Sequence, residues 1–246
     1  MPKKTLQQLE ILGSQVEVMV VEEYRNSYRA SVGKQKLIFR VPRGLGQEQL
    51  AQAWRWFIEW AERLYHEQPA VFKPLVLSQY SSADILQVGK KRYTVNISLE
   101  ERLTSSGRLL PGNEIQLRIG SGLGEIERHK ATKTLLSRIV AQDFLPEITL
   151  KVGEINAQFI RKPVRQVRLS YQHSKWGSCS SHGNINLSTR LLFAPDEVID
   201  YVILHELAHL VEMNHSPRFW EIVRKAMPEF RERERWLREH GPGCDF

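Results

Sequence analysis

The sequence has little cysteine and no long hydrophobic run. Its only cysteines are Cys179 and Cys244, which lie far apart. A helix needs about 20 apolar residues to cross a bilayer, and no segment approaches that length, so we expect no membrane association. The basic residues Lys3 and Lys4 are not followed by the apolar segment of a secretory signal. We therefore expect a cytoplasmic protein whose two cysteines are free thiols.

Acidic residues are missing from one long segment. The chain has 28 Asp and Glu residues and a net charge of +7, yet residues 155–195 contain no acidic residue. The segment does contain basic residues, namely Arg161, Lys162, Arg165, Arg168, Lys175 and Arg190. Such a stretch favours an acidic partner such as nucleic acid, but it is equally typical of a solvated sheet face. No internal repeat or low-complexity tract is apparent.

The first half of the chain is dominated by strand patterns. Alternating apolar residues bounded by turn residues predict strands at 16–21, 28–32 and 36–41, and a hairpin of residues 86–88 and 93–97. Between them, apolar residues at helical spacing predict a helix over 47–65. Residues 104–112 are rich in Ser, Gly and Pro, which is typical of loops.

The second half has mixed character. It predicts helices over 126–144 and 146–159, a strand over 164–171 with an antiparallel partner at 184–187, a helix from Pro195, and a final helical region over 217–239 broken by Pro228. The change of character follows the glycine-rich segment 120–122, where we place a domain boundary. The expected fold class is therefore α+β, with a β-rich domain over 1–122 and a second domain over 123–246.

The run His205-Glu206-Leu207-Ala208-His209 carries the chemistry of the chain. Two histidines four residues apart lie one turn apart on one helix face, so both imidazoles can reach the same metal ion. The pair could also be an ordinary partly buried one. However, the segment 198–211 around it is core-like, and burying two histidines and a carboxylate there costs several kcal/mol unless something binds them.

Zinc explains why these residue types occur together. A catalytic zinc site uses three protein ligands and keeps a fourth position for water, whose pKa falls to about 7. A carboxylate that is not itself a ligand can then take the proton of that water as it attacks a carbonyl. Glu206, directly after the first histidine, is the expected catalytic base.

The third ligand is less constrained by the motif. His215 lies six residues beyond His209, and the chain between them must leave the helix and turn back. Asn214 can adopt the left-handed conformation that such a turn needs. Glu221 is the competing ligand. We favour His215, because imidazole suits zinc and the spacing matches a known three-histidine arrangement.

Other residues are expected to support the site. Ligating histidines usually donate their second ring nitrogen to an oxygen, and Asp200 or Glu212 is placed to accept it. A peptidase also needs a group that stabilises the developing oxyanion. The candidates for this role are Tyr201, His182, Arg190 and Lys175.

Further motifs stand in order around the histidine run. They are Lys175-Trp176-Gly177-Ser178-Cys179-Ser180, the strand 184–187, Pro195, Val198-Ile199-Asp200-Tyr201-Val202, Asn214-His215-Ser216 and Phe219-Trp220. Together they resemble the YgjP-like metal-dependent hydrolases, and Val41-Pro42-Arg43-Gly44 is similar to the family's usual front half. The resemblance implies a zincin-like metallopeptidase domain with His205, His209 and His215 as ligands of Zn²⁺ and Glu206 as catalytic base. The pattern is also similar to that of the WLM and SprT proteases, which act on proteins bound to DNA.

The leading hypothesis is a zinc-dependent metallopeptidase that cleaves a peptide or protein substrate. We expect the stretch 181–187 to be an exposed edge strand that pairs with an extended peptide. A second hypothesis is a nucleic-acid-associated protein, or a protease acting on DNA-bound proteins, that uses the basic stretch 161–190. A third is a metal hydrolase for a small amide or ester.

Overall fold

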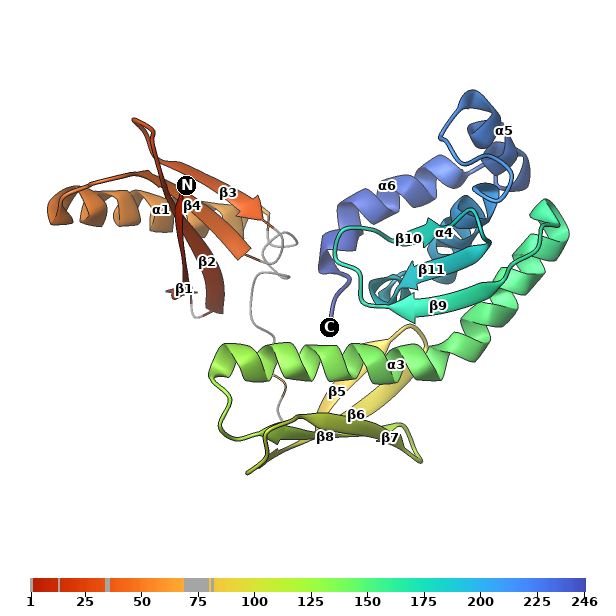
Figure 1. Ribbon diagram of the computed structural model, residues 1–246, viewed down its shortest axis with the longest axis horizontal. Coiled ribbons are helices and arrows are strands. Elements are labelled where there is room, and N and C mark those ends of the chain that lie inside the picture. The colour runs from red at the N-terminus through yellow and green to blue at the C-terminus, as the bar shows by residue number, and fades with distance from the viewer. Residues whose placement is uncertain (1, 13, 34–35, 69–79, 81) are drawn as a thin grey trace. The chain divides into compact units, whose positions relative to one another are not determined.

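The chain folds into two compact units, residues 1–78 and residues 79–246. The computed structural model describes residues 2–12, 14–33, 36–68, 80 and 82–246 (Figure 1). Each unit is described by itself. The observed division lies ahead of the boundary expected after residue 122.

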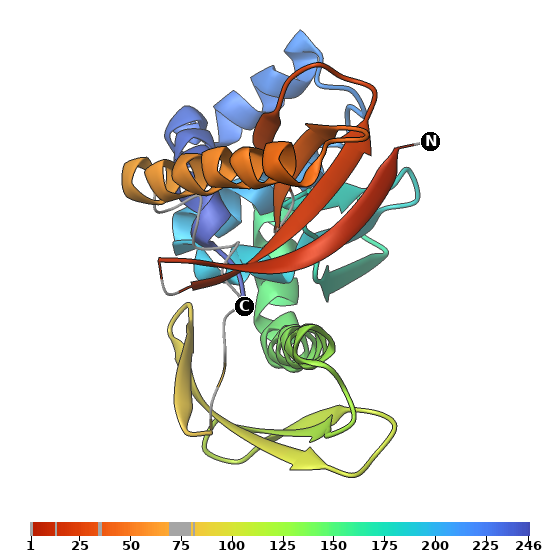
Figure 2. The same cartoon turned by 90° about the vertical axis from the view of Figure 1, so that its left-hand side faces the viewer.

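The first unit is a four-stranded sheet with one helix. Its elements are β1 (Lys3–Ile11), β2 (Ser14–Glu23), β3 (Arg29–Gly33), β4 (Lys36–Pro42) and α1 (Gln47–Glu67). The strand order is β1-β2-β4-β3, in which β2 and β4 run parallel and the two outer pairs are antiparallel. The helix α1 crosses one face of this sheet (Figure 2). The three expected strands and the helix over 47–65 are confirmed, whereas β1 was not expected, because most of its residues are exposed and lack apolar alternation.

The core of the first unit lies between the sheet and α1. Alternate residues of β4 are buried, as expected for a strand with one face on a core. Phe39 of β4 stacks on Phe57 of α1 with ring centroids 4.5 Å apart, and Trp54 meets Phe39 edge-on at 5.0 Å. These aromatic contacts stabilise the packing of the helix on the sheet. The aromatic stripe of this helix therefore serves the core.

The second unit begins with another four-stranded sheet and a long helix. Its elements are β5 (Asp84–Val88), β6 (Lys91–Glu100), β7 (Ser106–Leu110), β8 (Glu114–Gly120) and α3 (Glu125–Ile155). The hairpin of β5 and β6 around Gly89 is confirmed. The segment 104–112, expected as a loop, contains the strand β7. The two helices expected on either side of Pro146 are one continuous helix, which bends along its course as an internal proline favours (Figure 1).

The two sheet-and-helix modules have the same topology. The expectation that the chain has no internal repeat was therefore wrong. The second sheet has the order β5-β6-β8-β7, with the same parallel and antiparallel pairings as the first. Both initial hairpins join their strands through two residues, and both helices follow an N-cap glycine, Gly46 or Gly124. The sequence signal is the similarity of Arg40-Val41-Pro42-Arg43-Gly44-Leu45-Gly46 to Arg118-Ile119-Gly120-Ser121-Gly122-Leu123-Gly124.

The second module belongs to the same core as the rest of the second unit. Buried residues of β5, β6 and β8 form one apolar cluster with α3 and the helix that follows the basic stretch. Tyr93 and Lys91 of β6 also donate hydrogen bonds to the Asp143 carboxylate on α3, at 2.5 and 2.8 Å. The glycine-rich segment 120–122 is therefore a turn between a strand and its covering helix, which is why the division does not fall there.

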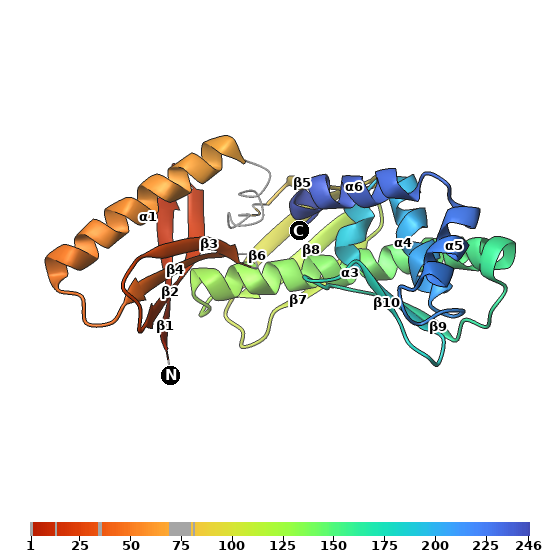
Figure 3. The same cartoon turned by 90° about the horizontal axis from the view of Figure 1, so that it is seen from above.

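The remainder of the second unit is a small sheet and three helices. Its elements are η1 (Asn156–Ile160), β9 (Gln166–Ser170), β10 (Gly177–Cys179), β11 (Asn184–Ser188), η2 (Thr189–Phe193), α4 (Asp196–Ala208), α5 (Pro217–Ala226), α6 (Phe230–His240) and η3 (Gly241–Gly243). The helices α5 and α6 lie beside α4 (Figure 3). The break of the final helical region near Pro228 is confirmed. None of the helices in the described part of the chain is both long and apolar enough to cross a membrane.

The small sheet differs from the expectation in two respects. Its order is β10-β11-β9, so β11 is the central strand and the expected edge strand over 181–187 was wrong. The strand β9 pairs with β11 in parallel, and the antiparallel partner of β11 is β10. A three-residue strand such as β10 is too short to show an apolar pattern in a sequence.

One residue of the basic stretch does not lie on the surface. Arg161, Lys162, Arg165, Arg168 and Lys175 are exposed, whereas Arg190 is buried at 8% exposure. The Arg190 guanidinium donates hydrogen bonds to the backbone carbonyls of His173, Gly241 and Cys244 at 2.7 to 2.8 Å. Its charge is therefore used inside the fold. In the described part of the chain Cys179 and Cys244 are not joined in a disulfide, as expected.

The Asp143 carboxylate gives a first prediction. Burial alone would raise its pKa, but the hydrogen bonds from Lys91 and Tyr93 outweigh burial and lower it. A carboxylate with a lowered pKa stabilises the fold above its unfolded pKa, and this stabilisation is lost as the pH falls through the folded pKa. We expect Asp143→Asn to reduce the free energy of unfolding by about 2 kcal/mol above about pH 5. Urea unfolding at several pH values measures this, and a deficit that stays constant down to about pH 3 would contradict the assignment.

Candidate metal centre

The helix α4 is buried on almost all sides. Asp196 and Glu197 occupy its first turn, where carboxylates favour the positive end of the helix dipole. Nine of its thirteen residues are buried, which is typical of a helix inside a core. His205 and Glu206 lie in its last turn, and His209 is the residue that ends it.

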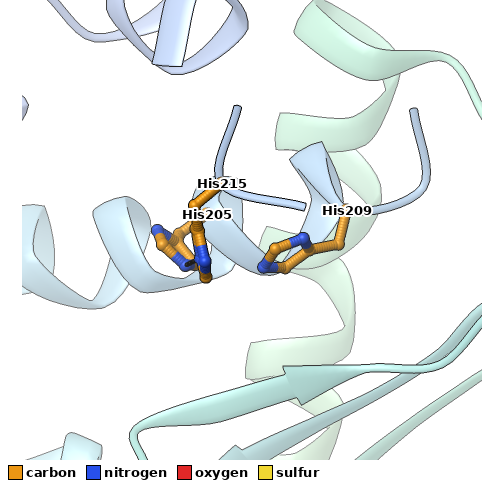
Figure 4. A group of neighbouring side chains, drawn as sticks. All are labelled: His205, His209 and His215. Atoms are coloured by element: carbon orange, nitrogen blue, oxygen red, sulfur yellow. Dashed lines mark hydrogen bonds between the residues drawn. The ribbon is translucent and has the colours of Figure 1, made fainter. Parts of the chain in front are cut away.

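Three histidines converge at the end of this helix (Figure 4). One ring nitrogen of each of His205, His209 and His215 lies within 4.8 Å of the other two. The Nε2 atoms of His205 and His215 are 3.0 Å apart. The expected pair and the favoured third histidine thus come together, although they originate from the helix, its end and the loop beyond it.

The chain returns to the helix through a short loop. The backbone N–H groups of Val211 and Glu212 both donate to the Ala208 carbonyl at 3.0 Å, and that of Ser216 donates to the Asn214 carbonyl at 2.8 Å. Ser216 then caps α5 by accepting a hydrogen bond from the Phe219 N–H. Asn214 does not have a positive φ, so its expected left-handed conformation was wrong. The turn closes through these hydrogen bonds instead.

The protonation states suit metal binding. Burial, followed by the neighbouring histidines, lowers the pKa of His205 to about 4. Burial also lowers the pKa of His209, although a hydrogen bond to the Glu212 carbonyl acts in the opposite direction. Imidazoles with a lowered pKa are neutral at pH 7, which is the form that binds a metal ion.

The hydrogen bonds of the rings also fit a metal ion. His209 donates its Nδ1 hydrogen to the Glu212 backbone carbonyl at 3.1 Å, which leaves Nε2 as a lone-pair donor. The Nδ1 atom of His205 is buried and has no hydrogen-bond partner among the described residues. Three imidazole nitrogens on converging rings fit a divalent transition metal such as zinc.

Phe219 supports all three rings and was not recognised as part of the site from the sequence. It is fully buried, and its ring centroid lies 4.9, 4.6 and 4.8 Å from those of His205, His209 and His215. Trp220 stacks on His215 at 5.8 Å. The motif Phe219-Trp220 was the only sign of this contact in the sequence, where it marked the family resemblance and not a contact with the histidines.

Glu206 is buried beside the histidines. It is 6% exposed, and burial raises its pKa to about 7, against the opposing effect of Lys175. Its side chain lies directly against the backbone of Gly177 in β10. A Cβ atom at this glycine would lie 2.6 Å from Glu206 Cγ and 2.7 Å from Oε1. Gly177 therefore leaves the space that this carboxylate occupies, a role that only the fold reveals.

A pocket opens next to His205 and Glu206. Its volume is about 520 Å³. Apart from these two residues and Gly177, its lining comes from Trp176, Tyr201, Val202, Glu234, Leu237 and Arg238. This size lies in the range of ordinary ligand sites.

The residues expected to orient or replace a histidine ligand differ in their contacts. The Asp200 carboxylate accepts a hydrogen bond from Lys151 at 2.8 Å, so it is engaged with α3. Glu212 does meet His209, but through its backbone carbonyl and not its carboxylate. Glu221 pairs with Lys225 at 2.7 Å and is absent from the cluster of possible ligands.

The four oxyanion candidates lie in different surroundings. Tyr201 lines the pocket, and burial raises the pKa of its hydroxyl above the usual value, so the group stays protonated. Arg190 is engaged with backbone carbonyls. Lys175 and His182 are exposed. Of the four, only Tyr201 shares a pocket with Glu206.

The chain was compared with solved structures, curated proteins and family models. The metallopeptidase zymogens abylysin of Pyrococcus abyssi and jannalysin of Methanocaldococcus jannaschii, known from crystal structures, are each 25% identical to this chain, with TM-scores of 0.35 and 0.33. Each match covers 37% of this chain and 92% of the other. A search of curated proteins gave no match. The model of the YgjP-like metallopeptidase domain matches residues 26–240. The chain therefore belongs to the YgjP-like metallopeptidase family, as the resemblance implied.

Proposed function

We propose that this chain is a zinc-dependent peptidase in which His205, His209 and His215 hold the metal ion and Glu206 is the catalytic base. The proposal rests on the three histidine ring nitrogens that lie within 4.8 Å of one another, and on the buried Glu206 carboxylate, which lines the same pocket as His205. Membership of a metallopeptidase family supports the same reaction.

The residues of the chain have separate roles in this proposal. A zinc ion held by His205, His209 and His215 would polarise the substrate carbonyl and lower the pKa of water to about 7. Glu206 accepts the proton of the attacking water and passes it to the leaving amine. Burial raises the pKa of the Glu206 carboxyl in the metal-free chain, which favours a group that can accept a proton and return it.

The edge strand β10 supports a peptide as substrate. It pairs with β11 on one side only, and its first residue, Gly177, lies against Glu206. An extended peptide can add to such an edge through backbone hydrogen bonds. This arrangement would bring a scissile peptide bond to the catalytic carboxylate, and it favours a peptide over a small amide or ester. Because Arg190 is buried, the nucleic-acid alternative would depend on the remaining basic residues.

The first test concerns Glu206. The variant Glu206→Gln keeps the shape of the side chain but cannot accept a proton. We expect the variant to bind zinc at the wild-type stoichiometry and its kcat on denatured casein to fall by about 10²- to 10⁴-fold. Wild-type turnover by the zinc-loaded variant would show that another group is the base.

The second test concerns the third ligand. We expect His215→Ala to lose stoichiometric zinc after dialysis, because two imidazoles remain where three are needed. Glu221→Ala is the matched control on the neighbouring helix and should retain zinc. Elemental analysis measures both. Zinc retained by His215→Ala and lost by Glu221→Ala would replace His215 with Glu221.

The third test concerns Gly177. A methyl group there would displace the Glu206 side chain. We expect Gly177→Ala to lower kcat at least about tenfold while zinc content stays unchanged, because the carboxylate and not the ligands is moved. Gly153→Ala is the control, since a Cβ at that position meets no atom within 4 Å. Equal activity of the two variants would exclude this positioning role.

A further inference from the structure

The pocket beside Glu206 is lined by both polar and apolar residues. Trp176, Val202 and Leu237 contribute apolar surface, and the buried Tyr201 contributes its ring. Glu234 and Arg238 also line the pocket but are exposed, so they stand at its mouth. The apolar part of the lining is therefore suited to an apolar group that enters past two opposite charges.

The Trp176 wall is held by two contacts. The Arg190 guanidinium lies 4.7 Å from the centre of the Trp176 ring, in a cation–π contact. The ring also lies so close to Gly241 that a Cβ there would be 2.5 Å from it. Because Arg190 also binds the Gly241 carbonyl, the ring is fixed in place. A rigid wall of this kind belongs to a preformed pocket.

Another wall belongs to α6, which packs on α4. Phe230 at the start of α6 stacks on Tyr201 with centroids 6.3 Å apart, and it also stacks on Trp220 of α5 at 5.5 Å. Leu237 then lines the pocket two turns later, 9% exposed. The α6 wall is thus tied to the helix that carries His205 and Glu206.

We propose that this pocket receives the side chain of a substrate residue next to the scissile bond, and that it selects a large apolar residue such as Phe, Leu or Met. The inference rests on the proposed peptidase function. A pocket of about 520 Å³ has room for such a side chain. A charged side chain would have to leave water among Trp176, Val202 and Leu237, which is unfavourable. Small side chains would leave the interior unfilled.

The test is a cleavage profile of the zinc-loaded full chain. A library of blocked synthetic peptides that differ at one position is digested, and cleavage sites are mapped by mass spectrometry. The wild type should cleave beside Phe, Leu or Met. Leu237→Trp fills the interior and should shift the preference to Ala, Ser or Gly by about 10- to 200-fold in kcat/KM ratio. Arg235→Trp, which places the same ring on an exposed residue of α6 outside the pocket, should keep the wild-type profile.

A second variant avoids any change in the core. Arg238→Glu makes the mouth doubly acidic and should raise cleavage beside Lys and Arg several-fold relative to Phe, without changing the zinc content. Cleavage by the wild type with no preference for large apolar residues, or with a profile that neither variant alters, would overturn the pocket assignment while leaving the peptidase function intact.

A binding measurement separates the two proposals. Glu206→Gln loaded with zinc is titrated with a blocked peptide containing Phe and with its Gly counterpart, and Trp fluorescence reports binding. Tighter binding of the Phe peptide, abolished by adding Leu237→Trp, supports the pocket even if no peptide is cleaved. If no peptide is cleaved by the wild type, the proposed function fails. Equal binding of the two peptides contradicts the pocket alone.

Discussion

The packing of histidine rings and a carboxylate at the end of one core helix determines the chemistry of the site. The helix α4 is surrounded by core, and burial lowers the pKa of His205 and raises that of Glu206, so both groups favour the uncharged form. Burying such groups is costly unless they gain a partner. The Phe219 ring contacts all three histidine rings, which keeps them together although they come from different parts of the chain. A metal ion would supply the missing partner and offset that cost.

The surrounding architecture explains how the helix is held. The same sheet-and-helix module occurs twice, but only the second copy shares its core with α4. In that copy α3 covers the sheet β5–β8 and also contacts α4 and β9. The second module thus supports α4, the helix of the metal centre. Residues of the small sheet and of α6 line the adjoining pocket.

Patterns of neighbouring residues in the sequence predicted the local features of the structure. The histidine run, its apolar helix, the hairpin at Gly89 and the break near Pro228 follow from spacing and turn residues, and the structure has all four. The third histidine also joined the cluster, although the expected left-handed Asn214 did not. The family resemblance combined several such patterns, and the family model confirms it.

Features set by tertiary packing escaped prediction. The edge position of β10, the approach of Gly177 to Glu206 and the interior role of Arg190 depend on segments that meet only after folding. A glycine-rich segment looks the same in a sequence whether it forms a hinge between two domains or a turn within one. The sequence therefore could not show that the segment before residue 122 is a turn. The repeat was missed because only the seven-residue segments ending at Gly46 and Gly124 remain visibly alike.

X-ray absorption at the zinc K edge of the zinc-loaded chain measures whether three imidazoles hold the metal ion. We expect only nitrogen and oxygen neighbours at about 2.0–2.1 Å and the outer-shell scattering of three imidazoles. Fewer than three imidazoles, or a sulfur neighbour at about 2.3 Å contributed by Cys179 or Cys244, would contradict it.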